Sequence, residues 1–173
     1  MRGRRARARP LPAETIDLIV RVLGLLAARE CRAALVGACA VAVRSGVATR
    51  PVRDVDIYCA QRSAPVAILS AAGLSPVSHS KLLCGQAVVD IVHPDLARIS
   101  RLNKVFLDYC LASQKPVPVA LSDGTPVSLS CPTTPALLAL KLCTSVRRTM
   151  WLTRRHDLFD AWTLIVRRRG RPL

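Results

Sequence analysis

Hydrophobic residues follow a helical spacing in several parts of the chain. Over residues 12–29, Ile16, Ile19, Leu23 and Leu26 recur at steps of three and four, which is typical of an amphipathic helix with one buried face. Helical patterns also predict helices over residues 38–43, 65–72, 96–112, 134–149 and 154–168.

Shorter segments have the patterns of β-strands. Residues 54–59 begin with a strict alternation of acidic and apolar side chains, and residues 33–36 are a short apolar run that ends at Gly37. Further strands are predicted over residues 77–83 and 86–92, and over 117–121 and 126–130 as a hairpin around Asp123-Gly124. Strands separated by helices in a short chain predict an α/β (α+β) fold, a small mixed sheet flanked by helices.

Composition places the chain among ordinary globular proteins. Of its 173 residues, 51% are hydrophobic and 21% charged, which excludes collagen-like, disordered and coiled-coil classes. Aromatic residues make up 3%, which argues against aromatic platforms on which nucleic-acid bases stack. No run of 18 uncharged apolar residues occurs, so we expect no membrane-spanning segment.

The charge balance is strongly basic. The 26 Lys and Arg residues exceed the 11 Asp and Glu residues, giving a formal net charge of +15. Such an excess attracts polyanions, including nucleotides and nucleic acids. A coding preference for arginine explains most surface positions equally well.

Seven cysteines form no C-x-x-C pair, and several lie inside apolar runs. An odd number without standard zinc-ligand spacing predicts buried free thiols and a reducing, cytoplasmic location.

Three aspartates are candidates for chemistry. Asp54 and Asp56 are two residues apart in a predicted strand, so both side chains project from one face. Asp90 lies within the apolar segment 87–92, where an unpaired carboxylate is costly and requires an arginine, backbone donors or a cation. If the two strands are neighbours, the three carboxylates converge as two-metal phosphoryl or nucleotidyl transfer requires. A structural Arg–Asp pair and ordinary surface acids remain the alternatives.

Residues 35–40 read Leu-Val-Gly-Ala-Cys-Ala, and residues 50–57 read Arg-Pro-Val-Arg-Asp-Val-Asp-Ile. In this order the two segments resemble the signature of the DNA polymerase β-like nucleotidyltransferase superfamily, in which a strand and a glycine turn open a helix and a D-x-D strand follows. Asp90 stands where the family has a third acid. Ala38 replaces the usual small polar residue of the turn, and Val52 the usual Thr or Ser.

The C-terminal third resembles the abortive-infection toxin (AbiEii-type) branch of that superfamily. Residues 134–142 contain the helix-borne Lys141, and residues 155–160 contain a D-x-x-D pair, Asp157 and Asp160. The resemblance covers residues 14–167. It implies a minimal nucleotidyltransferase core over 12–112 and a hairpin and helical extension over 113–173 that completes the site. The basic run at the N-terminus separately predicts a disordered arm over residues 1–11.

The resemblance also implies an activity and its residues. Asp54, Asp56 and Asp90 would hold two Mg²⁺ ions, or Mn²⁺, while a nucleoside monophosphate passes from a triphosphate to an acceptor hydroxyl and pyrophosphate leaves. Gly37, Ala38, Arg50 and Lys141 would hold the phosphates, and Asp157 would belong to the site. The alternatives from the residues alone are that Lys141 extends to solvent and that Asp157 and Asp160 pair with Arg147, Arg154 or Arg155.

The acceptor is left open among RNA ends, protein hydroxyls and small molecules. The basic charge favours a nucleic acid such as tRNA. Two other classes compete with the enzyme: a catalytically degenerate protein that binds nucleotide or nucleic acid, to which Ala38 and Val52 point, and a subunit that binds a protein partner, such as an antitoxin or a helical subunit. An exposed apolar helix face would favour the last.

Overall fold

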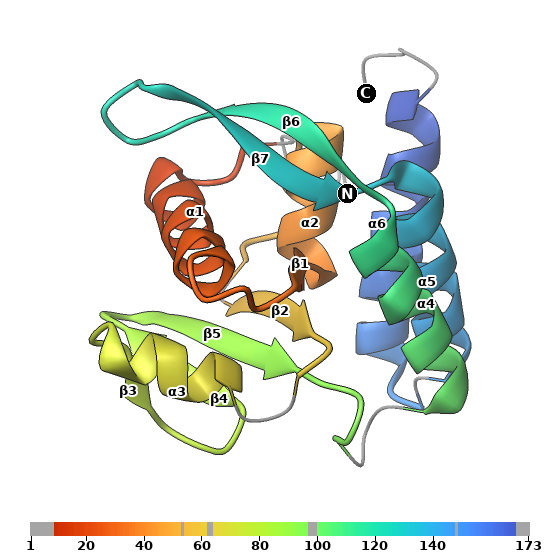
Figure 1. The fold of residues 1–173 in the computed structure, drawn as a ribbon. Helices are drawn as coiled ribbons and strands as arrows, with labels where there is room; N and C mark the ends of the chain where they lie inside the picture. The colour runs from red at the N-terminus through yellow and green to blue at the C-terminus, as the bar shows by residue number, and fades with distance from the viewer. Residues whose placement is uncertain (1–8, 53, 62–63, 97–99, 148, 169–173) are drawn as a thin grey trace.

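A mixed β-sheet forms the centre of the protein (Figure 1). The computed structural model describes residues 9–52, 54–61, 64–96, 100–147 and 149–168, and within them five strands pair in the order β1-β2-β5-β4-β3. The β2–β5 pair is parallel and the other pairs are antiparallel. The strands are β1 (Ala33–Leu35), β2 (Asp54–Cys59), β3 (Ser75–Pro76), β4 (Lys81–Cys84) and β5 (Ala87–Val92).

Helices and a hairpin surround this sheet. Helices α4, α5 and α6 lie together on one side of the molecule, whereas α1 and α3 lie on the other (Figure 1). The hairpin strands are β6 (Gln114–Ala120) and β7 (Pro126–Pro132). The helices are α1 (Ala13–Ala27), α2 (Gly37–Ser45), α3 (Ala64–Ala71), α4 (Arg101–Ala112), α5 (Thr134–Arg147) and α6 (Trp151–Arg168). The prediction of a small mixed sheet flanked by helices is confirmed.

Two predicted starts differ most from the structure. The strand predicted over 77–83 begins at Lys81, because the backbone N–H groups of Val77 and Ser78 both donate to the Lys81 carbonyl and bend the chain there. The helix predicted from residue 96 begins at Arg101, where the Ser100 hydroxyl caps it by accepting from the Asn103 N–H.

The last residues of the predicted N-terminal arm contact the folded chain. Arg9 forms an isolated β-bridge with Ala48, and Leu11 packs against the core, so the disorder predicted for residues 1–11 does not extend over residues 9–11. Residues 1–8 of that arm lie outside the described residues.

One core of aliphatic side chains joins the sheet to its helices. Ile19 and Leu26 of α1, Ile57 of β2 and Leu137 of α5 are all fully buried. Tyr58 is the one aromatic residue among the buried core residues that the structure describes, and its hydroxyl donates to Asp108 Oδ1 on α4 at 2.5 Å. Over the described residues, no helix is long and apolar enough to cross a membrane.

All seven cysteines are free, as the sequence predicts, and six of them are buried. Burial raises the pKa of the Cys110 thiol to about 12 and that of Cys131 to about 11, so both stay protonated at neutral pH. Cys84 is half-buried.

We therefore expect one fast-reacting thiol in the native protein. Because the thiolate is the reactive form, an aromatic disulfide reagent at pH 8 should modify Cys84 quickly and the six buried thiols slowly. Absorbance of the released thiolate measures this. The variant Cys84→Ala should lose the fast phase, and several fast thiols in the folded variant would contradict the buried placement.

Candidate functional site

The predicted acidic residues lie on one face of the sheet. Asp54 and Asp56 are half-buried on β2, whereas Val55 between them is buried on the opposite face. The parallel register pairs Asp56 with Asp90 of β5, and the next register pairs Asp90 with Lys81 of β4. Residues paired in register project from the same face, so Asp56, Asp90 and Lys81 form a row across three neighbouring strands.

The glycine turn lies directly against this row. Gly37 has φ +68°, and a Cβ built on it would lie 2.0 Å from Asp56 Oδ2. The Val36 N–H donates to the Asp56 carbonyl at 2.9 Å and brings the start of α2 beside β2. Glycine is therefore required at position 37 both for its backbone conformation and for the space that the Asp56 carboxylate occupies.

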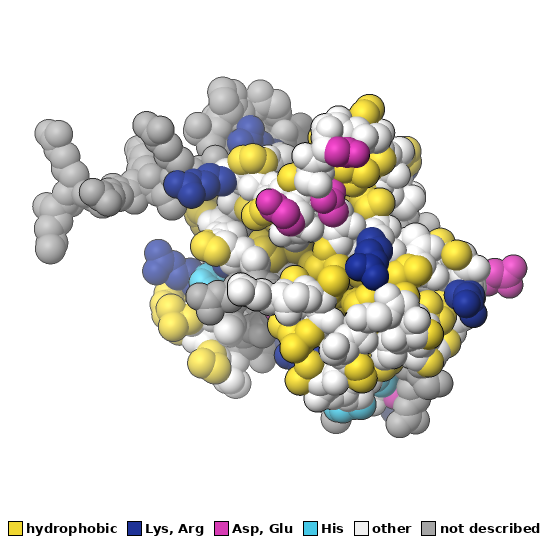
Figure 2. Space-filling view, turned by 90° about the vertical axis from the view of Figure 1, so that its left-hand side faces the viewer, with side chains coloured by type: hydrophobic (Ala, Val, Ile, Leu, Met, Phe, Trp, Pro, Cys, Tyr) yellow, Lys and Arg dark blue, Asp and Glu magenta, His cyan; other side chains and the backbone are white. Residues whose placement is uncertain are grey.

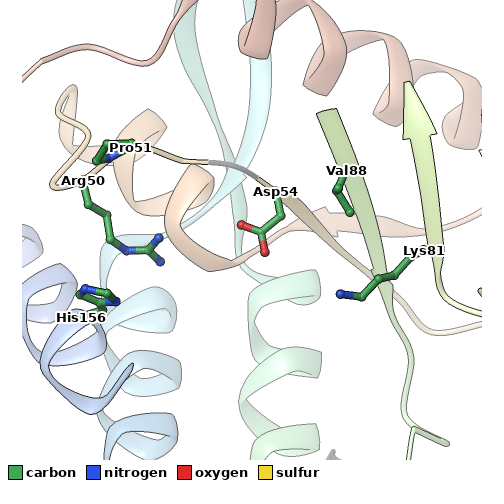
Figure 3. A pocket seen from close by; sticks show the side chains of 6 residues that line it. All are labelled: Arg50, Pro51, Asp54, Lys81, Val88 and His156. Atoms are coloured by element: carbon green, nitrogen blue, oxygen red, sulfur yellow. The ribbon is translucent and has the colours of Figure 1, made fainter. Parts of the chain in front are cut away.

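A pocket of about 490 Å³ opens beside these strands. Arg50 and Lys81 extend into it from opposite sides of Asp54, and His156 of α6 lies below Arg50 (Figure 3). Pro51 and Val88 complete the lining. Two basic side chains thus flank the Asp54 carboxylate in the pocket.

The charges of four predicted site residues all act on the thiol of Cys39, near the start of α2. Burial raises the pKa of its thiol to about 12, and the charges of Asp56 and Asp54 add to the rise, whereas Arg50 and Lys141 oppose it. The Cys39 thiol also donates to the Asp54 carbonyl at 3.5 Å. The start of α2 therefore lies within reach of both acids and both cations.

Asp90 has an ion-pair partner that the sequence did not reveal. Lys81 Nζ lies 3.8 Å from Asp90 Oδ2, and the Asp90 side chain is 7% exposed against 46% for Lys81. Lys81 had no motif to mark it, because its place opposite Asp90 follows from the register of β4. Among the described residues, no group of three or more His, Cys, Asp or Glu side chains is placed to hold a metal ion. The three aspartates thus share a face without forming a ready-made ion site.

Lys141 and the two C-terminal aspartates form a buried cluster. Lys141 Nζ lies 3.0 Å from Asp157 Oδ1 and 2.8 Å from Asp160 Oδ2, and all three side chains are buried. The alternative in which Lys141 extends to solvent is wrong, because both aspartates are one turn apart on the face of α6 that packs on α5. The pair Lys141 and Asp157 is therefore in contact, and Asp160 joins it.

Asp160 also connects this cluster to the pocket. Its Oδ1 accepts a hydrogen bond from the Thr49 hydroxyl at 2.6 Å, next to Arg50 in the chain. Within the described residues, the buried Nε of Arg50 has no hydrogen-bond partner, so this guanidinium keeps a donor for another group. Helix α6 thereby fixes the loop that carries Arg50.

The fold has known counterparts among solved structures. A nucleotidyltransferase-like antigenic protein from Paracoccidioides brasiliensis matches 91% of this chain and 78% of its own, with 16% identity and a TM-score of 0.61. The antibiotic-resistance factor ANT(2'')-Ia matches 91% of this chain in two structures. In complex with adenylyl-2''-tobramycin, 96% of its chain matches with 16% identity and a TM-score of 0.56; in solution, 90% matches with 14% identity and a TM-score of 0.53.

The chain has the nucleotidyltransferase fold. At these identities the likeness concerns the fold, and the site of this nucleotidyltransferase-fold protein depends on its own residues. No protein-family model matches the sequence, and no curated protein is significantly similar to it.

The contact between Gly37 and Asp56 predicts a specific cost of substitution. Gly37→Ala should lower the free energy of unfolding by at least about 1 kcal/mol more than Gly46→Ala, because a methyl group at position 37 displaces the Asp56 carboxylate. Gly46 is the matched control, with φ +75° and nothing within 4 Å of its built Cβ. Urea unfolding measures both, and equal losses would contradict the contact.

The Lys141 cluster predicts a large effect on stability. Lys141→Met should lower the free energy of unfolding by about 3–5 kcal/mol, because two carboxylates would stay buried without their cation. Lys104→Met is the matched control, since Lys104 pairs with Asp108 at 3.9 Å on the surface of α4 and should change stability by less than about 1 kcal/mol. A loss at position 141 no larger than at 104 would show that the cluster contributes little.

Proposed function

We propose that this protein is a nucleotidyltransferase of the DNA polymerase β-like superfamily, which transfers a nucleoside monophosphate from a triphosphate to an acceptor hydroxyl and releases pyrophosphate. The observation that carries the proposal is the contact of the Gly37 turn with Asp56, because it joins a helix start to a carboxylate of the D-x-D strand. The nucleotidyltransferase fold supports the same activity.

The start of α2 is suited to hold phosphate. Its N-cap residue, Val36, makes no side-chain hydrogen bond to it, and backbone N–H groups at a helix start such as those of Gly37 and Ala38 are donors that suit an anion. Arg50, with its unpartnered Nε, adds a guanidinium on the same side of Asp54. We assign the triphosphate to this half of the pocket.

The residues fit a divalent cation in part. Asp54 and Asp56 present carboxylate oxygens, the ligands that Mg²⁺ prefers, on one face beside the pocket. Asp90 would join them once its carboxylate turns from Lys81, because the described residues contain no preformed group of three such ligands. When bound, Mg²⁺ or Mn²⁺ would neutralise the charge that builds on the transferring phosphate.

The chain's own groups account for the remaining steps. The acceptor oxygen forms a bond to the α-phosphorus, the bond from that phosphorus to the bridging oxygen breaks, and pyrophosphate leaves. Asp90 accepts the proton of the acceptor hydroxyl. The Lys141 ammonium lies between Asp157 and Asp160, and Asp160 accepts the hydrogen bond from Thr49 beside Arg50. We therefore assign Lys141 a second role, to hold the Arg50 loop in place, besides the phosphate contact that the resemblance implies.

The acceptor we propose is an anion, with tRNA or another nucleic acid first. Lys81 and Arg50 extend into the pocket from either side of Asp54, and the whole chain carries +15. Such an excess of positive charge attracts a polyanion.

The abortive-infection toxin branch and a cytoplasmic location are parts of the same proposal. The direct contact of Lys141 with Asp157 supports the branch, because these are the two residues that carry the resemblance to it. Seven free cysteines support a reducing compartment.

A catalytically degenerate protein is the second candidate. Ala38, Val52 and the pairing of Asp90 with Lys81 favour it, since such a protein needs to bind nucleotide but not to group three carboxylates.

A single assay separates the two candidates. We expect the protein to transfer label from α-labelled triphosphates to pooled tRNA in the presence of Mg²⁺, and Asp54→Ala/Asp56→Ala to lose transfer by at least about a thousandfold while staying folded by circular dichroism. Gel electrophoresis of the labelled acceptor measures transfer. Nucleotide binding without transfer to RNA, protein or small acceptors would identify the degenerate form.

A further inference from the structure

Helices α5 and α6 expose an apolar face that the nucleotidyl transfer does not use. Of the fourteen large hydrophobic side chains exposed in the described part of the chain, nine lie between positions 142 and 165. Both tryptophans of the protein are among them, Trp151 at 67% and Trp162 at 48% exposure. Exposed tryptophans at this density are typical of interfaces between proteins.

The exposed residues form one continuous surface. Trp151, Leu158, Trp162 and Ile165 follow one another at helical spacing along a single side of α6. Leu142 and Ile165 then line a shared pocket of about 540 Å³, which joins the two helices. We call this surface the α5–α6 face.

Among the side chains whose burial is described on these two helices, every exposed charge is positive. Helix α5 contains no acidic residue, and the two acids of α6, Asp157 and Asp160, are buried against Lys141. The side chains of Arg147, Arg154 and Arg155 are exposed. The opposite side of the molecule differs, because acidic and basic side chains are interspersed there (Figure 2).

This charge pattern selects the partner. A second copy of the chain would bring the same arginines together across a symmetric contact, which costs free energy. A nucleic acid suits the arginines and could stack on the tryptophans, but it would leave the aliphatic side chains of Leu142, Leu158 and Ile165 without an apolar partner. A helix with an apolar stripe and acidic flanks matches both the face and its charges.

We propose that the α5–α6 face binds an acidic amphipathic helix of a partner protein. The proposal does not depend on nucleotidyl transfer, since none of its residues lines the pocket beside Asp54.

Intrinsic fluorescence tests this directly, because both tryptophans lie on the face. The probe is a three-heptad peptide with leucine at the a and d positions and glutamate elsewhere. We expect a blue shift of the tryptophan emission on binding, with a dissociation constant below about 100 μM. The same peptide with lysine in place of glutamate should bind at least about tenfold more weakly, because it meets the arginines.

A pair of variants locates the site. Leu158→Glu/Ile165→Glu keeps both tryptophans and should weaken peptide binding at least about tenfold. Val77→Glu/Leu83→Glu adds the same charge at exposed positions near β4 and should leave binding unchanged. Circular dichroism confirms that each variant is folded.

Four results would overturn the proposal. The first two are that the folded protein does not bind the acidic peptide, or that it binds the lysine peptide equally well. The third is that a uridine oligonucleotide shifts the tryptophan emission and the peptide does not. The fourth is that light scattering shows a dimer, which Leu158→Glu/Ile165→Glu converts to a monomer. Since none of these measures label transfer, failure here leaves the proposed activity untouched.

Discussion

The close approach of Asp56 to Gly37 is the constraint on which the rest of the site depends. The carboxylate occupies the space of a side chain that glycine lacks, and the Val36 N–H holds the neighbouring backbone to β2. This contact sets the start of α2 against the D-x-D strand, and the parallel register then brings Asp90 to the same face. A side chain at position 37 would separate the two halves of the arrangement.

The local sequence pattern predicted how site residues are arranged within a single strand or helix. Alternation around Val55 was sufficient to place Asp54 and Asp56 on one face, because the side-chain period of a strand is two. Lys81 could not be predicted, since its place opposite Asp90 depends on a bend at residues 77–80 that shifts the start of β4. The sequence placed Lys81 in a predicted strand over residues 77–83 but did not indicate Asp90 as its ion-pair partner.

Lys141 illustrates a second limit of the sequence. A lysine among leucines is compatible with extension to solvent or with burial, and the choice is decided by what packs opposite. In this fold, Asp157 and Asp160 lie one turn apart on the facing helix and compensate the buried ammonium. The D-x-x-D spacing was visible in the sequence, but the pairing of α5 with α6 required the tertiary structure. The same pairing buries both aspartates, so the charged side chains that remain exposed on α5 and α6 in the described part of the chain are arginines.

The hydrogen bond from Thr49 to Asp160 spans 111 positions of the chain. A protein emerging from the ribosome has made β1, α2 and β2 long before α6 exists, so the loop beside Arg50 waits for its anchor until α6 has been synthesised. The pocket therefore matures well after its own strands, and a chain that stops short of α6 carries the acidic strand without the support that holds the Arg50 loop in place.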